Sequence, residues 1–309
     1  MWSLSESKTF KLCQIQWCYK NCLANARAKD PLRHEAYLLG KLQSISSWRG
    51  SLVDSVISNV IVPELKRKKF PSFADVLQEA MDLFERQLEF ARRHPLHQPN
   101  FAPSKAGSSF AAFRCIEHDG VISGAEIEKA RIEINQALKN LFTKTEIWSK
   151  LLKAQYLISQ RPLSFTHSGE TVRAVPDLIA FYRNEPPLII DWKVHSFGIY
   201  KAWKQLGIYS LALSRCKPHK DFPHLSMWKE TDFRLWEFQL LTNKLRSYQL
   251  DELKLFEIEN YMAESINSIQ LVVGNAKRAK IDPLELLPAS SPELCQSCNY
   301  QSICWESAK

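Results

Sequence analysis

The chain has 309 residues, of which 45% are hydrophobic, 24% are charged and only 9 are glycine. Such proportions exclude a disordered chain, and the length predicts one elaborated domain or a core with a helical insertion. Lys and Arg outnumber Asp and Glu by 41 to 33, which gives a formal net charge of +8. This excess favours a polyanionic partner without identifying it.

Two kinds of segment, a membrane-spanning run and a signal peptide, are not indicated by the sequence. No run approaches the roughly 18 apolar residues of a membrane-spanning helix, and the first residues, MWSLSESKTFKLCQ, lack the pattern of a signal peptide. We therefore expect a cytoplasmic protein with no membrane partner. In that reducing compartment the 8 cysteines are expected to be metal ligands or buried thiols in preference to disulfides.

The first half of the chain predicts helices. Residues 5–45 have a helical pattern broken at Asp30-Pro31, and another helix is predicted to begin near Gly50, with apolar residues at helical spacing. Further along, the patterns predict an amphipathic helix at 73–94, an exposed proline-rich loop at 94–109, and a long helix at 123–153 with Ser123 as its N-cap.

The second half changes to a β-rich pattern. Residues 155–167, 171–183 and 187–194 are separated by turn signals and predict a three-strand meander. A helix (198–216), a strand (233–243) and a final helix (247–279) are expected to follow. We predict an α/β fold with a mixed sheet core flanked by helices, divided into N-terminal helices (1–59), a helical insertion (60–155) and a core with a cysteine-rich tail (156–309).

Two carboxylates and an ammonium group are predicted to meet at one edge of this sheet. Asp177 precedes the turn at 184–187, and Asp191 and Lys193 lie two residues apart on the next strand, so they point to the same face. Neighbouring carboxylates repel each other unless they share a proton or a divalent cation, and their hard oxygen atoms favour Mg²⁺ or Mn²⁺. The alternative is a structural ion pair at a strand end.

Gln205 and Tyr209 lie four residues apart in the predicted helix that follows, and hence on one face of it. We expect both to face the same site, where they would contact a phosphate or Lys193. His195 is the one histidine that we place near this site.

These residues resemble the motifs of the PD-(D/E)XK nucleases and, among them, the RecB-like exonucleases. The resemblance rests on Pro176-Asp177, Asp191-Trp192-Lys193 and Gln205-x-x-x-Tyr209, in the family's order and spacing. It implies a restriction-endonuclease-like fold and a DNA phosphodiesterase. In that enzyme Asp177 and Asp191 bind Mg²⁺ or Mn²⁺, Lys193 assists hydrolysis, and Gln205 and Tyr209 support substrate binding.

One motif departs from the family. An upstream Gly-x-x-x-His normally supplies a metal-binding histidine, whereas this chain has Gly50-Ser-Leu-Val53-Asp54. Aspartate is also a suitable hard ligand, so Asp54 joins the predicted metal ligands. The alternative is a carboxylate on the helix surface.

The cysteines cluster at both ends of the chain. Cys295-x-x-Cys298-x5-Cys304 provides three thiols within ten residues, and a fourth ligand for an inorganic centre must come from elsewhere. Candidates near the N-terminus are Cys13, Cys18 and Cys22.

Iron–sulfur members of the same family, the CRISPR-adaptation exonuclease and the AddAB nuclease domain, join one N-terminal cysteine to three C-terminal cysteines of this spacing. The resemblance implies a 4Fe–4S cluster bound by Cys13, Cys295, Cys298 and Cys304, which would clasp the first helix to the tail. Zinc is the alternative, since four cysteinates also suit tetrahedral Zn²⁺. We expect the other cysteines to be small buried residues: Cys18, Cys22, Cys115 and Cys216.

The implied substrate is DNA, either single-stranded or with duplex ends. No G-x-x-x-x-G-K-[ST] loop is present, so unwinding would need a helicase or another subunit of a repair or antiviral-defence system. Two alternatives stay open. One is a nuclease-fold scaffold that binds nucleic acid without cutting it, which the departure at Asp54 favours, and the other is an RNA-directed enzyme.

Overall fold

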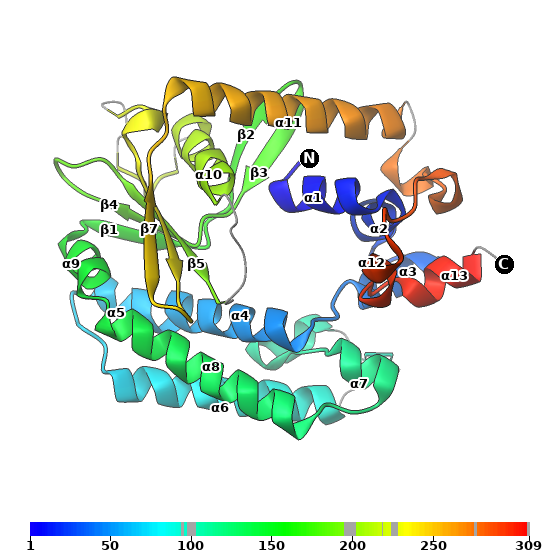
Figure 1. Ribbon diagram of the computed structural model, residues 1–309, viewed down its shortest axis with the longest axis horizontal. Coiled ribbons are helices and arrows are strands. Elements are labelled where there is room, and N and C mark those ends of the chain that lie inside the picture. Colours follow the sequence, from blue (N-terminus) through cyan, green and yellow to red (C-terminus); the bar gives the residue numbers. More distant parts are fainter. Residues whose placement is uncertain are drawn as a thin grey trace.

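The computed structural model describes residues 1–93, 96–97, 103–194, 202–217, 219–223, 228–274 and 277–307. A five-stranded sheet in the order β1-β4-β5-β6-β7 lies at its centre, with helices on both faces (Figure 1). The β5–β6 pair is parallel and the other pairs are antiparallel. The predicted mixed α/β architecture is therefore confirmed.

The N-terminal part is helical, as predicted, but in short pieces. Ser44 caps α4, since its hydroxyl accepts a 3.1 Å hydrogen bond from the backbone N–H of Ser47, so this helix begins before Gly50. The elements are α1 (Leu4–Leu12), α2 (Gln14–Trp17), the π-helical turn η1 (Cys18–Leu23), α3 (Pro31–Leu39), α4 (Ile45–Val56), η2 (Ile57–Ile61) and α5 (Val62–Lys66).

The helical block that follows confirms the helix predicted at 73–94. The helix predicted at 123–153 is divided at Lys144, and Ser123 occupies its N-cap position without a side-chain hydrogen bond. Part of the predicted loop at 94–109 is a 3-10 helix, and the rest is mostly outside the described residues, as is His195. The elements are α6 (Phe73–Arg93), η3 (Pro103–Ser109), α7 (Arg114–Asp119), α8 (Gly124–Thr143) and α9 (Thr145–Lys153).

The predicted three-strand meander is wrong in detail, because two of its runs are each divided into two strands. Gln160 interrupts the first run with a φ of 51°, and 175–177 interrupts the second. The small β2-β3 pair forms a separate sheet. The strands are β1 (Tyr156–Ser159), β2 (Leu163–His167), β3 (Glu170–Ala174), β4 (Leu178–Phe181), β5 (Leu188–Lys193), β6 (Arg234–Gln239) and β7 (Lys244–Tyr248), of which β7 was not expected.

The remaining helices lie near the sheet and in the tail. The helix predicted at 247–279 is shorter at both ends, because Asp251 caps it at its start and it ends before Gly274. The elements are α10 (Trp203–Arg215), η4 (Glu230–Asp232), α11 (Glu252–Val273), η5 (Arg278–Lys280), η6 (Pro283–Glu285), α12 (Pro292–Gln296) and α13 (Gln301–Ser307).

The central strands separate two apolar cores. Alternate side chains point to opposite faces of a strand: Ile189 packs on the side of α10 and α11, whereas Leu188 and Ile190 pack on the side of α4, α6 and α8. Every residue of β4 is buried. Burial on both faces explains why these strands have nearly continuous apolar sequences.

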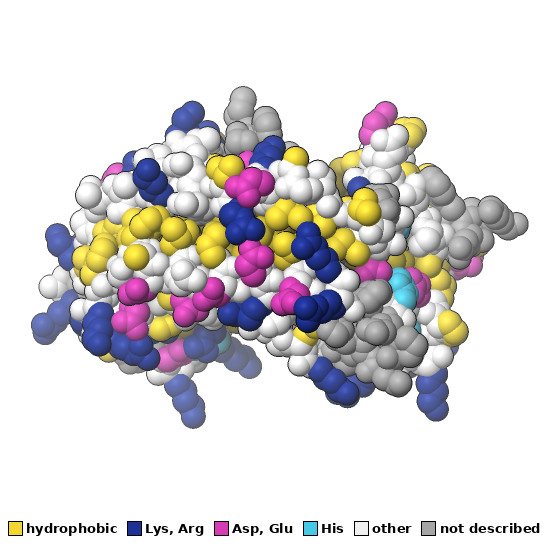
Figure 2. Space-filling model, turned by 90° about the horizontal axis from the view of Figure 1, so that it is seen from below, with side chains coloured by type: hydrophobic (Ala, Val, Ile, Leu, Met, Phe, Trp, Pro, Cys, Tyr) yellow, Lys and Arg dark blue, Asp and Glu magenta, His cyan; other side chains and the backbone are white. Residues whose placement is uncertain are grey.

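The helical block packs on the sheet and on α4 alike, since Trp48 and Leu52 of α4 share one core with α6 and α8. Figure 2 shows an apolar stripe on the outer face of the molecule, bordered by acidic and basic side chains. On α8, the side chain of Ile132 is 59% exposed. The division at residues 59 and 155 stays a prediction.

The two ends of the chain pack together. Helix α2 lies beside α12 and α13 (Figure 1). The backbone N–H of Gln14 donates a 3.1 Å hydrogen bond to the carbonyl of Leu287, and the rings of Tyr19 and Tyr300 stack at 5.8 Å. In the described part of the chain, none of the helices combines the length and apolar character needed to cross a membrane.

Candidate active site

The pairing of β4 with β5 brings Asp177 to Asp191. Leu178 pairs with Ile190 in antiparallel register, so the residues next to this pair, Asp177 and Asp191, meet at the same edge. Asp177 lies just before β4 and not at the end of a strand. Its Oδ2 accepts a 2.9 Å hydrogen bond from the backbone N–H of Trp192.

Lys193, Gln205 and Tyr209 form a hydrogen-bonded chain around Asp191, whose side chain is buried. The ammonium nitrogen of Lys193 lies 2.6 Å from Oδ2 of Asp191 and 3.4 Å from Oε1 of Gln205. The side-chain nitrogen of Gln205 donates to Oδ1 of Asp191 at 2.8 Å and contacts the Tyr209 hydroxyl at 2.6 Å. Asp191, Lys193, Gln205 and Tyr209, all predicted for one site, are thus linked by direct contacts in which Gln205 touches the other three.

Helix α4 brings Asp54 to the same place. The side-chain nitrogen of Gln160 lies 3.0 and 2.8 Å from the two carboxylate oxygens of Asp54 and 3.2 Å from Oδ1 of Asp177. Asp54 is half-buried and lines the same cavity as Asp177 and Asp191. Gln160 was missed in the sequence, since an isolated glutamine between two strands carries no signal of its own.

Burial of several carboxylates together disfavours their charged forms. Burial, with the nearby charges of Asp191 and Asp54, raises the pKa of Asp177 to about 8. Burial also raises the pKa of Asp54 to about 6, against the hydrogen bond from Gln160. Burial raises the pKa of Asp191, which Lys193 opposes. Groups of this kind gain most from a cation that neutralises them.

A cavity of about 480 Å³ contains these groups: Asp54, Asp177, Asp191, Trp192, Lys193 and Gln205 line it together with serines of α4. The oxygen atoms suit a hard divalent cation. Oδ2 of Asp191 is paired with the ammonium group of Lys193. Among the described residues, however, no three His, Cys, Asp or Glu side chains are arranged as metal ligands. Gln160 bridges Asp54 and Asp177 instead, and Lys193 is paired with Asp191.

Arg49 supports the end of β5 that carries Lys193. Its buried guanidinium donates to the carbonyl oxygen of Val194 and to Glu133 of α8, and contacts the Ser46 hydroxyl at 3.3 Å. The residue thereby joins α4, α8 and the strand beside the site. Sequence analysis missed it because an arginine in a helix usually lies at the surface.

Glu237 is a further buried acid beside the site. It pairs with Asp191 in the register of β5 and β6, and its charge raises the pKa of Asp191. The hydroxyl of Tyr248 contacts Oε2 of Glu237 at 2.6 Å, and Gln239 donates to Oε1 at 2.9 Å. A glutamate inside the apolar run of β6 was the signal that could have identified it.

The four cysteines singled out by the resemblance line one cavity of about 250 Å³: Cys13, Cys295, Cys298 and Cys304. Burial raises the pKa of Cys298 to about 11, and the charges of the other three thiols add to this effect. Among the residues that the structure describes, however, no three of these thiols are arranged as the ligands of one metal ion.

The other N-terminal cysteines lie apart from that cavity. The Cys18 thiol is buried and points to the carbonyl oxygen of Ile281, with a sulfur–oxygen distance of 3.8 Å. Cys22 is also buried, whereas Cys115 and Cys216 are half-buried. Among the N-terminal cysteines, the fold therefore brings Cys13 to the C-terminal three.

Comparison with known proteins places this geometry in a family. The model of the PD-(D/E)XK nuclease superfamily matches residues 1–305. No curated protein matches the chain. A crystal structure of a candidate exonuclease from Eubacterium rectale is 14% identical and is similar with a TM-score of 0.46, covering 96% of this chain and 86% of that one.

A second solved structure, that of SSO0001, is 15% identical with a TM-score of 0.29, covering 74% of this chain and 96% of that one. Both likenesses are too remote to carry an argument about function. The family match spans nearly the whole chain, and this protein belongs to the PD-(D/E)XK nuclease superfamily.

Proposed function

We propose that this protein is a divalent-metal-dependent deoxyribonuclease of the RecB-like type, an exonuclease acting on single-stranded DNA or on duplex ends. One observation carries the proposal: Asp177, Asp191 and Lys193 meet in one cavity, with Gln205 bonded to the last two. Family membership supports phosphodiester hydrolysis.

Asp177 and Asp191, with Asp54, would hold Mg²⁺ or Mn²⁺ in this cavity. The bound ion would supply positive charge at a phosphoryl oxygen and acidify water. Lys193 is held by Asp191 and Gln205, so its ammonium group can orient the attacking water or stabilise the negative charge of the transition state. Tyr209 fixes Gln205 from the helix side.

The test is cleavage of labelled DNA with Mn²⁺ or Mg²⁺. Asp191→Ala and Lys193→Ala should each abolish cleavage while the proteins stay folded, because the first loses a metal ligand and the second loses the cation at the reacting phosphate. Asp82→Ala and Lys139→Ala, at exposed positions of α6 and α8, are the matched controls and should cut normally. Full activity of either site variant would overturn the assignment.

The exonuclease part needs its own substrates. A linear single strand should be degraded from an end, whereas a circular strand of the same sequence should stay intact. Cutting of the circle would show endonuclease action and leave the catalytic residues as assigned. An RNA strand in the same series tests the alternative of an RNA-directed enzyme.

A second candidate is a subunit that binds nucleic acid without cutting it. The contacts of Gln160 with both Asp54 and Asp177 favour it, since an amide already donates hydrogen bonds to the oxygen atoms that a cation would need. In a gel assay such a protein would retard the DNA without shortening it at any concentration of Mn²⁺.

We further propose that the cysteine cavity holds a 4Fe–4S cluster, with zinc as the alternative. Four thiols line one small cavity, and cysteinate is the ligand that such clusters require. Because the ligands come from both ends of the chain, the centre would clasp α2 to α12 and α13. Its function would be mainly structural.

A further inference from the structure

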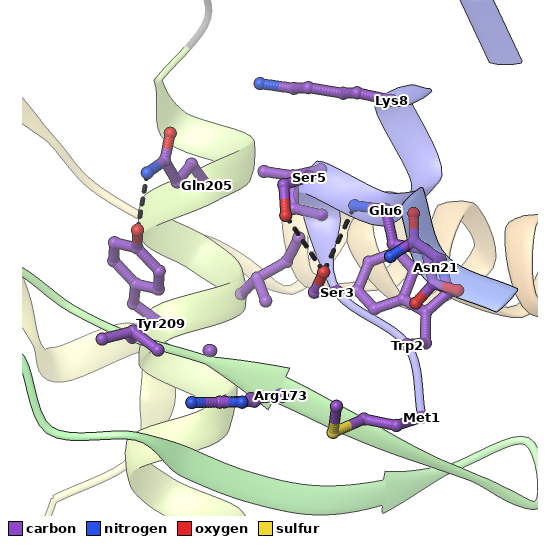
Figure 3. A pocket seen from close by; sticks show the side chains of 14 residues that line it. Met1, Trp2, Ser3, Ser5, Glu6, Lys8, Asn21, Arg173, Gln205 and Tyr209 are labelled. Carbon is purple, nitrogen blue, oxygen red and sulfur yellow. Dashed lines mark hydrogen bonds between the residues drawn. The ribbon is translucent and has the colours of Figure 1, made fainter. Parts of the chain in front are cut away.

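The cavity that contains the carboxylates is adjoined by a second cavity of about 410 Å³, which is distinct from the cysteine cavity. It lies between α1, β3 and α10, as Figure 3 shows. Gln205 lines this cavity as well as the one that contains the carboxylates. A ligand in the second cavity would therefore reach the group that holds Lys193 and Asp191.

Two cations line the second cavity from different elements. Lys8 extends from α1 toward the α10 side, and Arg173 lies on β3 (Figure 3). Within the described part of the chain, neither side chain forms an ion pair or a hydrogen bond. Unpaired cations on the walls of one cavity attract an anionic ligand.

Lys8 also interacts electrostatically with Lys193 and Asp191 of the active site. Its side chain is exposed, and partial burial and the charge of Lys193 lower the pKa of Lys8, against the opposing charge of Asp191. Two ammonium groups that lie near each other repel. An anion bound between them would remove this repulsion.

The remaining walls suit a nucleotide. Trp2, Leu4, Val175 and Ile208 provide apolar surface, and Ser5 and Asn21 provide polar groups. The acidic side chain of Glu6, which also lines the cavity, is paired with Arg278. A nucleic acid strand alternates an apolar base face with a phosphate, and proteins that bind single strands combine cations with such surfaces. The size is that of a pocket for a small ligand, not of a groove for a duplex.

The N-terminal wall is held in place by hydrogen bonds. The backbone N–H of Trp2 donates to the carbonyl of Thr171 at 2.7 Å, and the backbone N–H of Arg173 donates to the carbonyl of Trp2 at 2.8 Å. The indole of Trp2 donates to the hydroxyl of Ser265 at 3.0 Å. The cavity is thus formed before a ligand arrives, and ordering it costs little.

We propose that this cavity binds the single nucleic acid strand next to the scissile bond, with Lys8 and Arg173 contacting phosphates that flank the scissile phosphate. The inference rests on the proposed nuclease function and names the strand-binding part of the same site. The metal site cuts, and the cationic cavity holds the strand that leads into it.

The test measures binding apart from cleavage. A fluorescent single strand of thymidylates is titrated with protein in EDTA over a series of salt concentrations. Lys8→Ala and Arg173→Ala should each weaken binding at least about fivefold and reduce the slope of log affinity against log salt by about 0.7, the value for one lost phosphate contact. Lys8→Arg should bind like wild type, because it keeps the charge.

Lys139→Ala is the charge-matched control, because Lys139 is exposed on α8 and lines neither cavity. Unfolding temperatures show whether the variants stay folded. In cleavage assays Lys8→Ala should raise KM more than it lowers kcat. A change confined to kcat would contradict a role in holding the strand.

The outcomes separate the two proposals. If wild type cuts DNA but Lys8→Ala and Arg173→Ala bind like wild type, the inference is wrong and the nuclease stands. If wild type binds strands through Lys8 and Arg173 but never cuts, the binding site stands and the nuclease function fails. If Lys8→Ala and Arg173→Ala weaken binding of a blunt duplex as much as binding of the single strand, the restriction to a single strand is refuted.

Discussion

The backbone N–H of Trp192 donates a 2.9 Å hydrogen bond to the carboxylate of Asp177. Trp192 lies between Asp191 and Lys193, so this bond holds Asp177 beside both residues without help from an ion. The β4–β5 pairing, which buries apolar residues on both faces, thus determines the distance between the two acids. The core of the protein and the geometry of its site depend on the same register.

Gln160 is expected to stabilise the metal-free protein and to lose that role when a cation binds. Gln160→Ala removes the amide that contacts Asp54 and Asp177, so the two carboxylates repel each other more strongly. We predict a lower unfolding temperature in EDTA and a larger rise on addition of Mn²⁺ than in wild type. Thermal unfolding with and without Mn²⁺ measures both values.

A left-handed backbone conformation complicates this substitution, because Gln160 has a φ of 51°. Ser168→Ala is the matched control, since Ser168 is exposed, has a φ of 47° and lies away from the site. If both variants lose the same stability and respond alike to Mn²⁺, the amide contact has no special role.

The metal-free protein should become less stable as the pH rises. The folded-state pKa of Asp177 is raised to about 8 and that of Asp54 to about 6, above the ordinary value of 3.8. Between these values the folded chain binds protons that the unfolded chain releases, so stability falls as pH increases from about 4 to 8.

Asp177→Asn should flatten this dependence between pH 6 and 8, because the asparagine cannot ionise. Urea unfolding in EDTA at several pH values gives the free energy of unfolding and its slope. The apparent affinity for Mg²⁺ should rise over the same range, since cation and proton compete for the carboxylate. A wild-type slope unchanged by Asp177→Asn would assign the titration to another group.

The four clustered cysteines should be needed for a cluster, whereas the other cysteines should not. Anaerobically purified wild type is expected to be brown with about four irons per chain. Cys298→Ser should lose both colour and iron because one ligand of the cavity is gone. Cys18→Ser is the control, since Cys18 lies against Ile281 and not in that cavity.

If the purified protein is colourless and contains one zinc per chain, the same four cysteines bind zinc and not an iron–sulfur cluster. Brown Cys298→Ser with undiminished iron, or loss of iron in Cys18→Ser, would overturn the ligand assignment. Oxidation of the brown protein in air should bleach it and lower its unfolding temperature, because the clasp between the two ends of the chain is lost.

Gly207 permits the close approach of α10 to α11. A Cβ at this position would overlap Cδ1 of Ile258 and lie 3.3 Å from Leu250. Gly207→Ala should therefore lower the free energy of unfolding by about 1–3 kcal/mol, the usual cost of overpacking. Since α10 carries Gln205 and Tyr209, we expect Gly207→Ala to lower nuclease activity as well as stability.

Ile258→Val removes the overlapping Cδ1 and alone should cost about 0.5–1.5 kcal/mol. The double variant is expected to be more stable than the sum of the single losses, because each change relieves the other. Gly124→Ala, which meets no atom within 4 Å, is the control. If the losses in free energy of unfolding, measured with urea, simply add in the double variant, the contact with Ile258 is not the cause of the destabilisation by Gly207→Ala.

The sequence by itself determined the class of fold, the superfamily and most of the long elements. Helix 73–94 and the strands around Asp177 and Asp191 were readable because their apolar residues repeat at short, regular spacings. Such patterns record which face of an element is buried, and they need no knowledge of neighbouring elements. The roles of Asp177, Asp191 and Lys193 stay predictions that the experiments above test.

Only the tertiary structure decided which distant residues meet. Gln160 contacts Asp54 across 106 positions of sequence, and Lys8 lies in one cavity with Arg173 and Gln205. No local period encodes these contacts, since they follow from how α1, α4 and α10 pack on the sheet. The same packing brings Cys13 to the C-terminal cysteines, because the position of each thiol depends on the association of the two ends of the chain.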